Sequence, residues 1–284
     1  MRLVIVSGLS GSGKSVALNV LEDAGFYCID NIPVGLLRSF VKEIEPRQDP
    51  DYDQVSVGLD ARNIPDVAQL PGLINELRKS GSGCEVVFLQ ASDDVLLSRF
   101  SETRRKHPLT SDDISLPEAL AKERQLLSPI IDMADLIIDT SSTTVYDLRD
   151  LLRDRIANRD QATLSILIES FGYKHGLPAD ADFVFDVRCL PNPYWEHKLR
   201  PLNGRDQPVR DFLGAEAQVQ EMISDIEAFL SRWIPRYQSF QRSYLTIAIG
   251  CTGGQHRSVY IAEALAERLM TAHGPIQTHH DELP

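Results

Sequence analysis

The sequence has few cysteines, and their spacing does not suggest a metal site. Its four cysteines, Cys28, Cys84, Cys189 and Cys251, are scattered along 284 residues without a C-x-x-C pair, which argues against a zinc ribbon and a disulfide framework. The chain also lacks an apolar stretch of membrane-spanning length and a signal-peptide region before its first apolar run. We therefore expect a cytoplasmic protein with reduced thiols and no membrane partner.

Positive charge is also scarce in this sequence. Lysine and arginine number 29 against 41 aspartates and glutamates, which gives a formal net charge of −12. A negative surface repels phosphates and so opposes non-specific binding to nucleic acid, although a local basic patch can still bind RNA. The remaining composition, 43% hydrophobic and 25% charged, is typical of a globular chain, and its length allows two domains.

The start of the chain carries a complete phosphate-loop pattern after an apolar run. The fixed positions of G-x-x-x-x-G-K-[ST] are filled by Gly8, Gly13, Lys14 and Ser15. Glycines let successive backbone N–H groups turn toward a phosphate, and a helix beginning near Gly13 adds its positive end. Lys14 would reach the β/γ-phosphates, and Ser15 would hold Mg²⁺. The predicted nucleotide site comprises Gly8, Leu9, Ser10, Gly11, Ser12, Gly13, Lys14 and Ser15.

Acidic residues follow two of the next predicted strands. Asp30 ends a short strand at 26–29, and Asp60 ends a strand at 55–59. Because open α/β sheets gather their sites at the carboxyl ends of the strands, both residues would lie beside the phosphate loop. Asp30 is a candidate Mg²⁺ ligand, or would position an attacking hydroxyl or water, and joins Lys14 and Ser15 as a catalytic candidate. At both positions the alternative is an ordinary turn residue.

A basic segment at 103–109 lies between two predicted helices, the second of which starts with a capping box, Ser115 to Glu118. Arg104 and Arg105 in this segment suit a nucleotide lid, because arginines neutralise charge on a transferred phosphoryl group. The alternative is a solvated surface run. The alternation of strands and helices around these motifs predicts a doubly wound parallel sheet of the P-loop NTPase/kinase-like type.

The composition turns polar near residue 158, which predicts a nucleotide-binding domain at 1–157 and a second α/β domain at 158–284. In the second domain, an apolar stripe over 219–233 predicts an amphipathic helix that ends before Pro235 and forms either core or an oligomer contact.

Near its end, the chain repeats the strand, glycine-rich loop and helix of its start. An apolar strand at 245–249 leads into a loop at 250–258 and then a helix. Glycines, a hydroxyl group, His256, Arg257 and the helix N-terminus would converge there, so we predict a second anion site.

The second loop also fits a different pattern. Cys251, Arg257 and Ser258 match the C-x5-R-[ST] loop of cysteine phosphatases. In such enzymes, a thiolate of lowered pKa attacks a phosphate held by loop amides. Asp186, after a strand at 183–185, is the available residue for a general acid but is not securely assigned. Phosphate binding is therefore favoured over catalysis.

Together these motifs closely resemble the RapZ/YvcJ family of nucleotide-binding proteins, the RNase adapter family, over essentially the whole chain. The resemblance rests on residues 8–15, 25–33, 60–63, 103–105, 169–176, 185–188 and 250–258. It implies binding of ATP and GTP with slow hydrolysis in the first domain, with residues 8–15 holding ATP. It assigns the guanine nucleotide to Asp60, Ala61, Arg62 and Asn63.

For the second domain, the resemblance implies a sensor of glucosamine-6-phosphate. In enterobacterial members this domain also binds a small regulatory RNA, presents it to the endoribonuclease RNase E and so controls synthesis of glucosamine-6-phosphate synthase. The family's sugar-phosphate pocket falls here on Asp186, Thr252, Gly253 and Arg257. With the residues around them, the predicted sugar-phosphate site comprises Asp186, Tyr194, Cys251, Thr252, Gly253, Gly254, His256, Arg257 and Ser258.

The chain departs from the family pattern at two places. Tyr194 stands where the sugar-phosphate-sensing members carry a histidine. The tail has no lysine or arginine after Arg268, whereas RNA-binding members end in a strongly basic tail.

The sequence thus favours a regulatory adapter that binds ATP and GTP, hydrolyses them weakly, and senses a phosphorylated amino sugar. RNA, an endoribonuclease and further copies of the chain are the macromolecular partners that the resemblance implies. The first alternative is a small-molecule P-loop kinase, with Asp30 as base or metal ligand and Arg104 and Arg105 in its lid. A cysteine phosphatase is the less favoured alternative.

Overall fold

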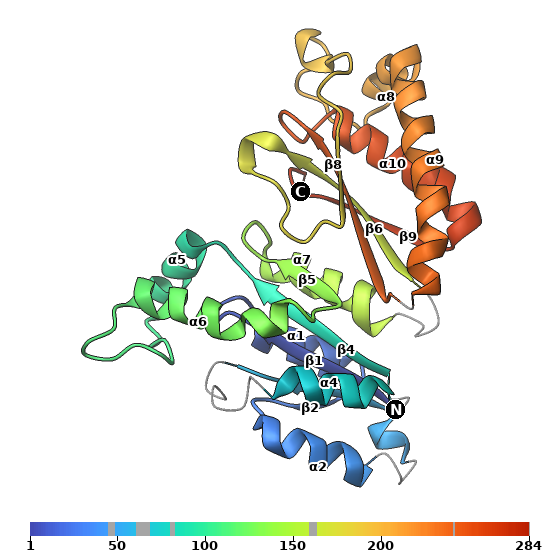
Figure 1. Ribbon diagram of the computed structural model, residues 1–284. Helices are drawn as coiled ribbons and strands as arrows, with labels where there is room; N and C mark the ends of the chain where they lie inside the picture. The colour runs from blue at the N-terminus through green and yellow to red at the C-terminus, as the bar shows by residue number, and fades with distance from the viewer. Residues whose placement is uncertain (45–48, 61–68, 80–82, 159–163, 241, 284) are drawn as a thin grey trace. The chain divides into compact units, whose positions relative to one another are not determined.

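The chain divides into two units, Met1–Gln161 and Ala162–Pro284, in a computed structural model (Figure 1). The structure describes residues 1–44, 49–60, 69–79, 83–158, 164–240 and 242–283. The predicted site residues Ala61, Arg62 and Asn63 lie outside these ranges. Within the described residues, no helix has the length and apolar composition that would let it cross a membrane.

The described part of the first unit contains one parallel sheet with strand order β2-β3-β1-β4-β5. Its strands are β1 (Arg2–Gly8), β2 (Tyr27–Ile29), β3 (Gln54–Gly58), β4 (Gly83–Gln90) and β5 (Leu136–Asp139). Its helices are α1 (Lys14–Asp23), α2 (Val34–Ile44), α4 (Leu70–Lys79), α5 (Asp93–Thr103), α6 (Leu116–Ile131) and α7 (Val145–Leu152). This arrangement confirms the predicted kinase-like, doubly wound sheet, with β1 at its centre.

The central strand β1 explains where the first candidate site lies. All residues of β1 are buried, because β3 and β4 pair with its two edges and helices cover the sheet. Leu3 and Ile5 belong to the apolar cluster shared with α2, α4 and α6, while the alternating Val4 and Val6 point to the opposite face of the sheet. Gly8 therefore ends the strand at the carboxyl edge of the sheet, where the phosphate loop begins.

The described part of the second unit contains another parallel sheet, with strand order β7-β8-β6-β9. Its strands are β6 (Ser165–Gly172), β7 (Phe183–Asp186), β8 (Tyr244–Cys251) and β9 (Ile276–His280). Its helices are α8 (Gln207–Gly214), α9 (Ala217–Ser239) and α10 (Arg257–His273). The predicted second α/β fold is thus confirmed, and β8 is an interior strand that runs into the second loop.

The predicted end of a helix before Pro235 is wrong, because α9 continues through this proline to Ser239. Ile234, directly before the proline, is buried and extends the apolar stripe into the core of the second unit. Pro235 itself is exposed, so the backbone hydrogen bond that it cannot make lies on the outer side of the helix. The packing of the stripe therefore outweighs the loss of one hydrogen bond.

A buried histidine fastens the last strand of the second unit. His280 Nδ1 lies 2.7 Å from Ser170 Oγ on β6, and His280 Nε2 lies 2.9 Å from Glu263 Oε1 on α10. Arg205 Nε also donates to Glu263 Oε1, at 2.8 Å. Burial is the largest influence on His280 and lowers its pKa, although the bond to Glu263 acts in the opposite direction.

We predict that titration of His280 contributes to a loss of stability of the second unit in mild acid. Because the folded-state pKa of His280 is lowered, the unfolded chain binds this proton first as the pH falls from neutrality. The free energy of unfolding should therefore depend less on pH in His280→Gln than in the wild type between about pH 7.5 and 5.5. Urea titrations followed by circular dichroism measure this slope. His197→Gln, which replaces an exposed histidine, is the matched control, and an unchanged slope in His280→Gln would refute the prediction.

Candidate functional site

The phosphate loop, residues 8–15, joins β1 directly to α1. Gly13 is the N-cap of α1, with φ 107°, and Gly8 has φ 151°. A Cβ on Gly8 would overlap the Leu89 carbonyl oxygen, and a Cβ on Gly13 would lie 2.8 Å from Leu148 Cδ2. Close packing against the backbone of Leu89 therefore requires glycine at position 8, and the positive φ favours glycine at position 13. The strand, loop and helix predicted from the sequence are all present.

The side chain of Lys14, the predicted phosphate-binding lysine, folds back toward the start of the phosphate loop. Lys14 Nζ donates a hydrogen bond of 2.8 Å to the Gly8 carbonyl oxygen. Ser15 follows in the first turn of α1 and is exposed. The cationic group and the hydroxyl group thus lie at the N-terminus of a helix, whose partial positive charge favours an anion.

A cavity of about 700 Å³ opens beside the loop. The predicted site residues that line it are Leu9, Ser10, Gly11, Ser12, Gly13, Lys14, Ser15, Asp60 and Arg105. Arg99, Lys106 and Glu102 also carry charges on its lining. With Lys14 and Arg105, the cationic side chains outnumber the carboxylates of Asp60 and Glu102. The cavity therefore suits an anionic ligand.

Asp30 and Arg104 of the predicted first site, like Gly8, are not part of this lining. Asp30 is exposed after β2, and a Cβ on Gly58 of the neighbouring strand would lie 2.8 Å from its Oδ1. Arg104 is exposed and closes α5 with φ 51°, while its backbone N–H donates to the Phe100 carbonyl oxygen. Their catalytic and lid roles stay predictions.

Arg99, which the sequence motifs did not indicate, forms part of the wall of the cavity. Its guanidinium donates to the carbonyl oxygen of Gly11 at 3.1 Å, and to Thr140 Oγ1 and the Thr140 carbonyl oxygen at 3.0 and 2.6 Å. Thr140 Oγ1 in turn donates to the Ser12 carbonyl oxygen at 3.0 Å. Arg99 on α5 and Thr140 after β5 therefore fix the backbone of the phosphate loop by hydrogen bonds to its carbonyl oxygens.

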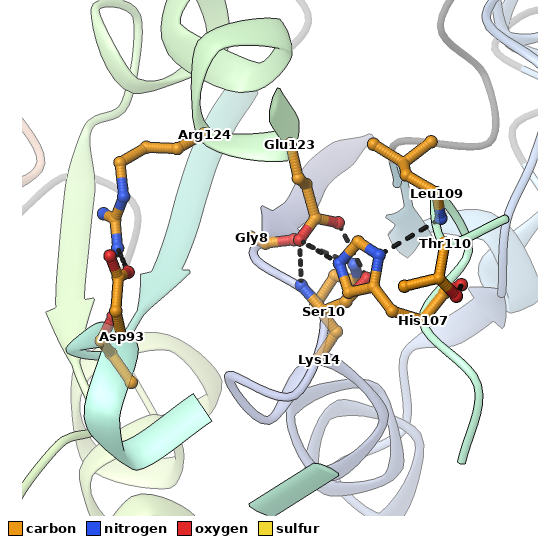
Figure 2. Close-up of polar contacts among 10 residues, drawn as sticks. Gly8, Ser10, Lys14, Asp93, His107, Leu109, Thr110, Glu123 and Arg124 are labelled. Carbon is orange, nitrogen blue, oxygen red and sulfur yellow. Dashed lines mark hydrogen bonds and ion pairs between the residues drawn. The ribbon is translucent and has the colours of Figure 1, made fainter. Parts of the chain in front are cut away.

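Glu123 and His107, also absent from the motifs, meet at the other side of the loop (Figure 2). The Ser10 backbone N–H donates to Glu123 Oε2 at 2.8 Å, and Ser10 Oγ donates to Glu123 Oε1 at 2.7 Å. His107 Nε2 lies 3.1 Å from Glu123 Oε2. Burial disfavours ionisation of Glu123, but these hydrogen bonds and the charge of Lys14 outweigh it and lower its pKa.

The second loop, residues 250–258, joins β8 to α10 and contains the buried guanidinium of Arg257. Arg257 is only 4% exposed. Its Nη1 donates to the carbonyl oxygens of Arg188 and Leu190 at 2.7 and 3.0 Å, and its Nη2 donates to Thr252 Oγ1 at 3.4 Å. Its Nε has no hydrogen-bond partner among the described residues. A positive charge held by neutral acceptors is suited to an anion.

Cys251 lies in the same loop, and the pKa of its thiol shifts in the opposite direction from the pKa of two other thiols of the chain. Its Sγ lies 3.2 Å from Ser258 Oγ. Burial opposes ionisation, but hydrogen bonds from the Ser258 side chain, from the backbone N–H groups of Ser258 and Gly254, and the charge of Arg257 lower its pKa. By contrast, burial raises the pKa of Cys28 to about 11 and that of Cys84 to about 12.

The remaining predicted residues of the second site have other contacts. Asp186 is exposed and forms a bidentate ion pair with Arg188, whose hydrogen bonds lower the pKa of this carboxyl group. An ionised, paired carboxylate is a poor general acid, which weighs against the phosphatase alternative. His256 Nε2 lies 3.2 Å from the Leu199 carbonyl oxygen, and burial lowers its pKa. Tyr194 is exposed, with the Arg200 guanidinium 4.5 Å from its ring centre.

The two adjacent glycines of the second loop give a matched test of its geometry. Gly254 has φ 72°, and a Cβ there would overlap Glu282 and lie 2.7 Å from the Gly172 nitrogen, whereas a Cβ on Gly253 meets nothing within 4 Å. We expect Gly254→Ala to lower the free energy of unfolding by about 1–3 kcal/mol and Gly253→Ala to change it by less than about 0.5 kcal/mol. Urea unfolding measures both. Equal effects of the two substitutions would show that the loop geometry is different.

Comparison with known proteins gives relatives over the full length of the chain. "Nucleotide-binding protein" of Alkalilimnicola ehrlichii is 53% identical over 100% of this chain and 98% of its own length. Proteins of the same name from Stutzerimonas stutzeri and Pseudomonas fluorescens are 53% and 51% identical, each with 100% of both chains covered. Among solved structures, shikimate kinase of Acinetobacter baumannii is 18% identical over 56% of this chain and 95% of its own, with a TM-score of 0.37.

Family models cover both units. The model of the RapZ-like N-terminal domain matches residues 1–160, and that of the RapZ C-terminal domain matches residues 164–284. The two matches follow one another along the chain. The chain therefore belongs to the RapZ family.

Proposed function

We propose that this chain is a nucleotide-binding regulatory adapter that holds ATP or GTP, with Mg²⁺, at its phosphate loop. The observation that carries the proposal is the cationic cavity of about 700 Å³, which opens on residues 9–15 at the N-terminus of α1. The names of the full-length relatives, all "Nucleotide-binding protein", support the same ligand class.

The chemistry of the loop fits a triphosphate. Lys14 would exchange the Gly8 carbonyl oxygen, 2.8 Å from its Nζ, for phosphate oxygens. Ser15 would hold Mg²⁺, which supplies charge neutralisation across the phosphates when bound. Arg99 and Arg105 on the lining would offset the remaining negative charge, because the planar guanidinium of arginine can donate two parallel hydrogen bonds to a pair of phosphate oxygens.

Weak hydrolysis is part of the proposal. Asp30, the carboxylate expected to position a water, is exposed and outside the cavity lining. A poorly positioned general base agrees with slow turnover, since proton transfer requires hydrogen-bond reach. The small-molecule kinase stays the alternative, and it is distinguished by stoichiometric appearance of a phosphorylated product during ATP turnover.

The second unit, in this proposal, senses a phosphorylated amino sugar such as glucosamine-6-phosphate. The buried Arg257 guanidinium supports an anion site in this loop, because its Nε has no hydrogen-bond partner among the described residues. The adapter role extends to a small regulatory RNA, an endoribonuclease and a homo-oligomeric state. Nucleotide binding in one unit would then alter recognition by the other, and the coupling would be reciprocal.

The thiol of Cys251 favours one second candidate function, a cysteine phosphatase. Its lowered pKa and its contact with Ser258 Oγ are the features that such a nucleophile requires. Turnover of p-nitrophenyl phosphate that is lost in Cys251→Ser would support this candidate. Turnover that is absent, or equal in the variant, would remove it.

The proposal predicts which ligand stabilises which variant. ATP, GTP and glucosamine-6-phosphate are each added at about 100 times the Kd, where a bound ligand stabilises the folded state by about 2.7 kcal/mol. In thermal unfolding, Lys14→Ala should lose the stabilisation by ATP and GTP and keep the stabilisation by glucosamine-6-phosphate. Arg257→Ala should lose the stabilisation by glucosamine-6-phosphate and keep the stabilisation by ATP and GTP. The control Lys42→Ala, at an exposed position of α2, should keep both. If ATP and GTP failed to stabilise the wild type, or stabilised Lys14→Ala equally, nucleotide binding at this loop would be refuted.

A further inference from the structure

We propose that Glu123 and His107 are positioning residues of the nucleotide site, which fasten the lid segment between α5 and α6 to the phosphate loop. The inference rests on the proposed binding of nucleotide at residues 8–15. It assigns a role to two buried polar side chains that the phosphate-loop motif does not include.

Several contacts converge on the carboxylate of Glu123. Glu123 on α6 accepts two hydrogen bonds from Ser10, from its backbone N–H at 2.8 Å and its hydroxyl group at 2.7 Å. It also faces His107 Nε2 at 3.1 Å, with both side chains fully buried (Figure 2). Such a carboxylate fixes both the main chain and the side chain of Ser10, a residue that lines the cavity.

Hydrogen bonds at both ring nitrogens fix the orientation of the His107 ring. The Leu109 backbone N–H donates to His107 Nδ1 at 3.1 Å, so Nδ1 acts as an acceptor. The ring proton therefore belongs on Nε2, where it is donated to Glu123. Each ring nitrogen has a defined partner, one within the lid segment and the other on α6, and the ring cannot turn without losing both.

His107 differs in burial from the residues around it in the lid segment. Residues 101–106 and Pro108 are exposed, whereas His107 is 2% exposed. Its ring also packs against Phe100 of α5, with ring centres 5.2 Å apart. His107 is thus the buried anchor of an otherwise exposed stretch.

The cations next to this anchor connect it to the nucleotide site. Arg105 and Lys106 directly precede His107, and both line the cavity beside residues 9–15. Holding His107 therefore holds two positive charges where the phosphates of a nucleotide would lie. Without the anchor, the same charges would sit on a flexible segment, and ordering them would reduce the affinity.

The histidine offers a matched pair of substitutions for the test. His107→Gln can place an amide N–H where Nε2 lies and so keep the donor to Glu123. His107→Asn places its oxygen near the position of Nδ1 and has no donor that reaches Glu123. Both variants remove the same imidazole ring and its packing on Phe100, so general destabilisation affects them alike.

The experiment measures ATP affinity by calorimetry and the rate of trypsin cleavage after Arg104, Arg105 and Lys106, in the full chain. We expect His107→Gln to stay within about three-fold of the wild type in both readouts. His107→Asn and Glu123→Ala should weaken ATP binding about ten-fold or more, because each removes hydrogen bonds to a charged group. They should also accelerate cleavage of the lid segment, and ATP should protect this segment in the wild type.

The outcomes separate this inference from the proposed function. If the wild type binds ATP and both histidine variants bind it equally well, with equal cleavage rates, the positioning role is wrong and nucleotide binding stands. The same conclusion follows if His107→Gln and His107→Asn are impaired to the same extent, because a purely structural role of the ring would explain that result. If the wild type binds no ATP, the proposed function fails, and a positioning role at the nucleotide site fails with it.

Discussion

Parallel strands bring their carboxyl ends to one edge of a sheet, and both candidate sites depend on this constraint. β1 and β8 are interior strands that pair on both sides, and each runs without interruption into a loop and the N-terminus of a helix. Because these strands are buried, the accessible polar groups at that edge are the backbone N–H groups of the loop that follows each strand. The same local arrangement therefore produces a candidate anion-binding loop in each unit.

The two loops prepare for an anion in different ways. Lys14 is a flexible side chain whose hydrogen bond to the Gly8 carbonyl oxygen must be exchanged when a phosphate binds. Arg257 is buried and already held by the carbonyl oxygens of Arg188 and Leu190. A fixed guanidinium loses little entropy on binding and selects geometry, whereas a mobile lysine acts as a point charge that can follow its ligand. This contrast agrees with the proposal that the first unit binds a nucleotide and the second unit senses a metabolite.

The sequence predicted what local spacing determines. Residues 8–15, the doubly wound sheet and the capping box, in which the Ser115 N–H donates to Glu118 Oε2 at 2.8 Å, all follow from short patterns. Glu123 and Arg99 could not be found in this way, because they reach the phosphate loop across 113 and 88 residues of chain. The helix end at Pro235 was wrong because the apolar stripe through Ile234 continues past the proline. Tertiary contacts decided these features, and a motif reports only local ones.

The central claim is that the phosphate loop, with its lid fastened by Glu123, receives a nucleotide. A crystal structure of the full chain with a non-hydrolysable ATP analogue and Mg²⁺ tests it most directly. The account predicts that the triphosphate lies on residues 8–15, that Lys14 Nζ leaves the Gly8 carbonyl oxygen for a phosphate oxygen, and that the contacts of Glu123 with Ser10 and His107 persist. An analogue bound elsewhere, or a Lys14 side chain still on Gly8 beside the bound triphosphate, would contradict it.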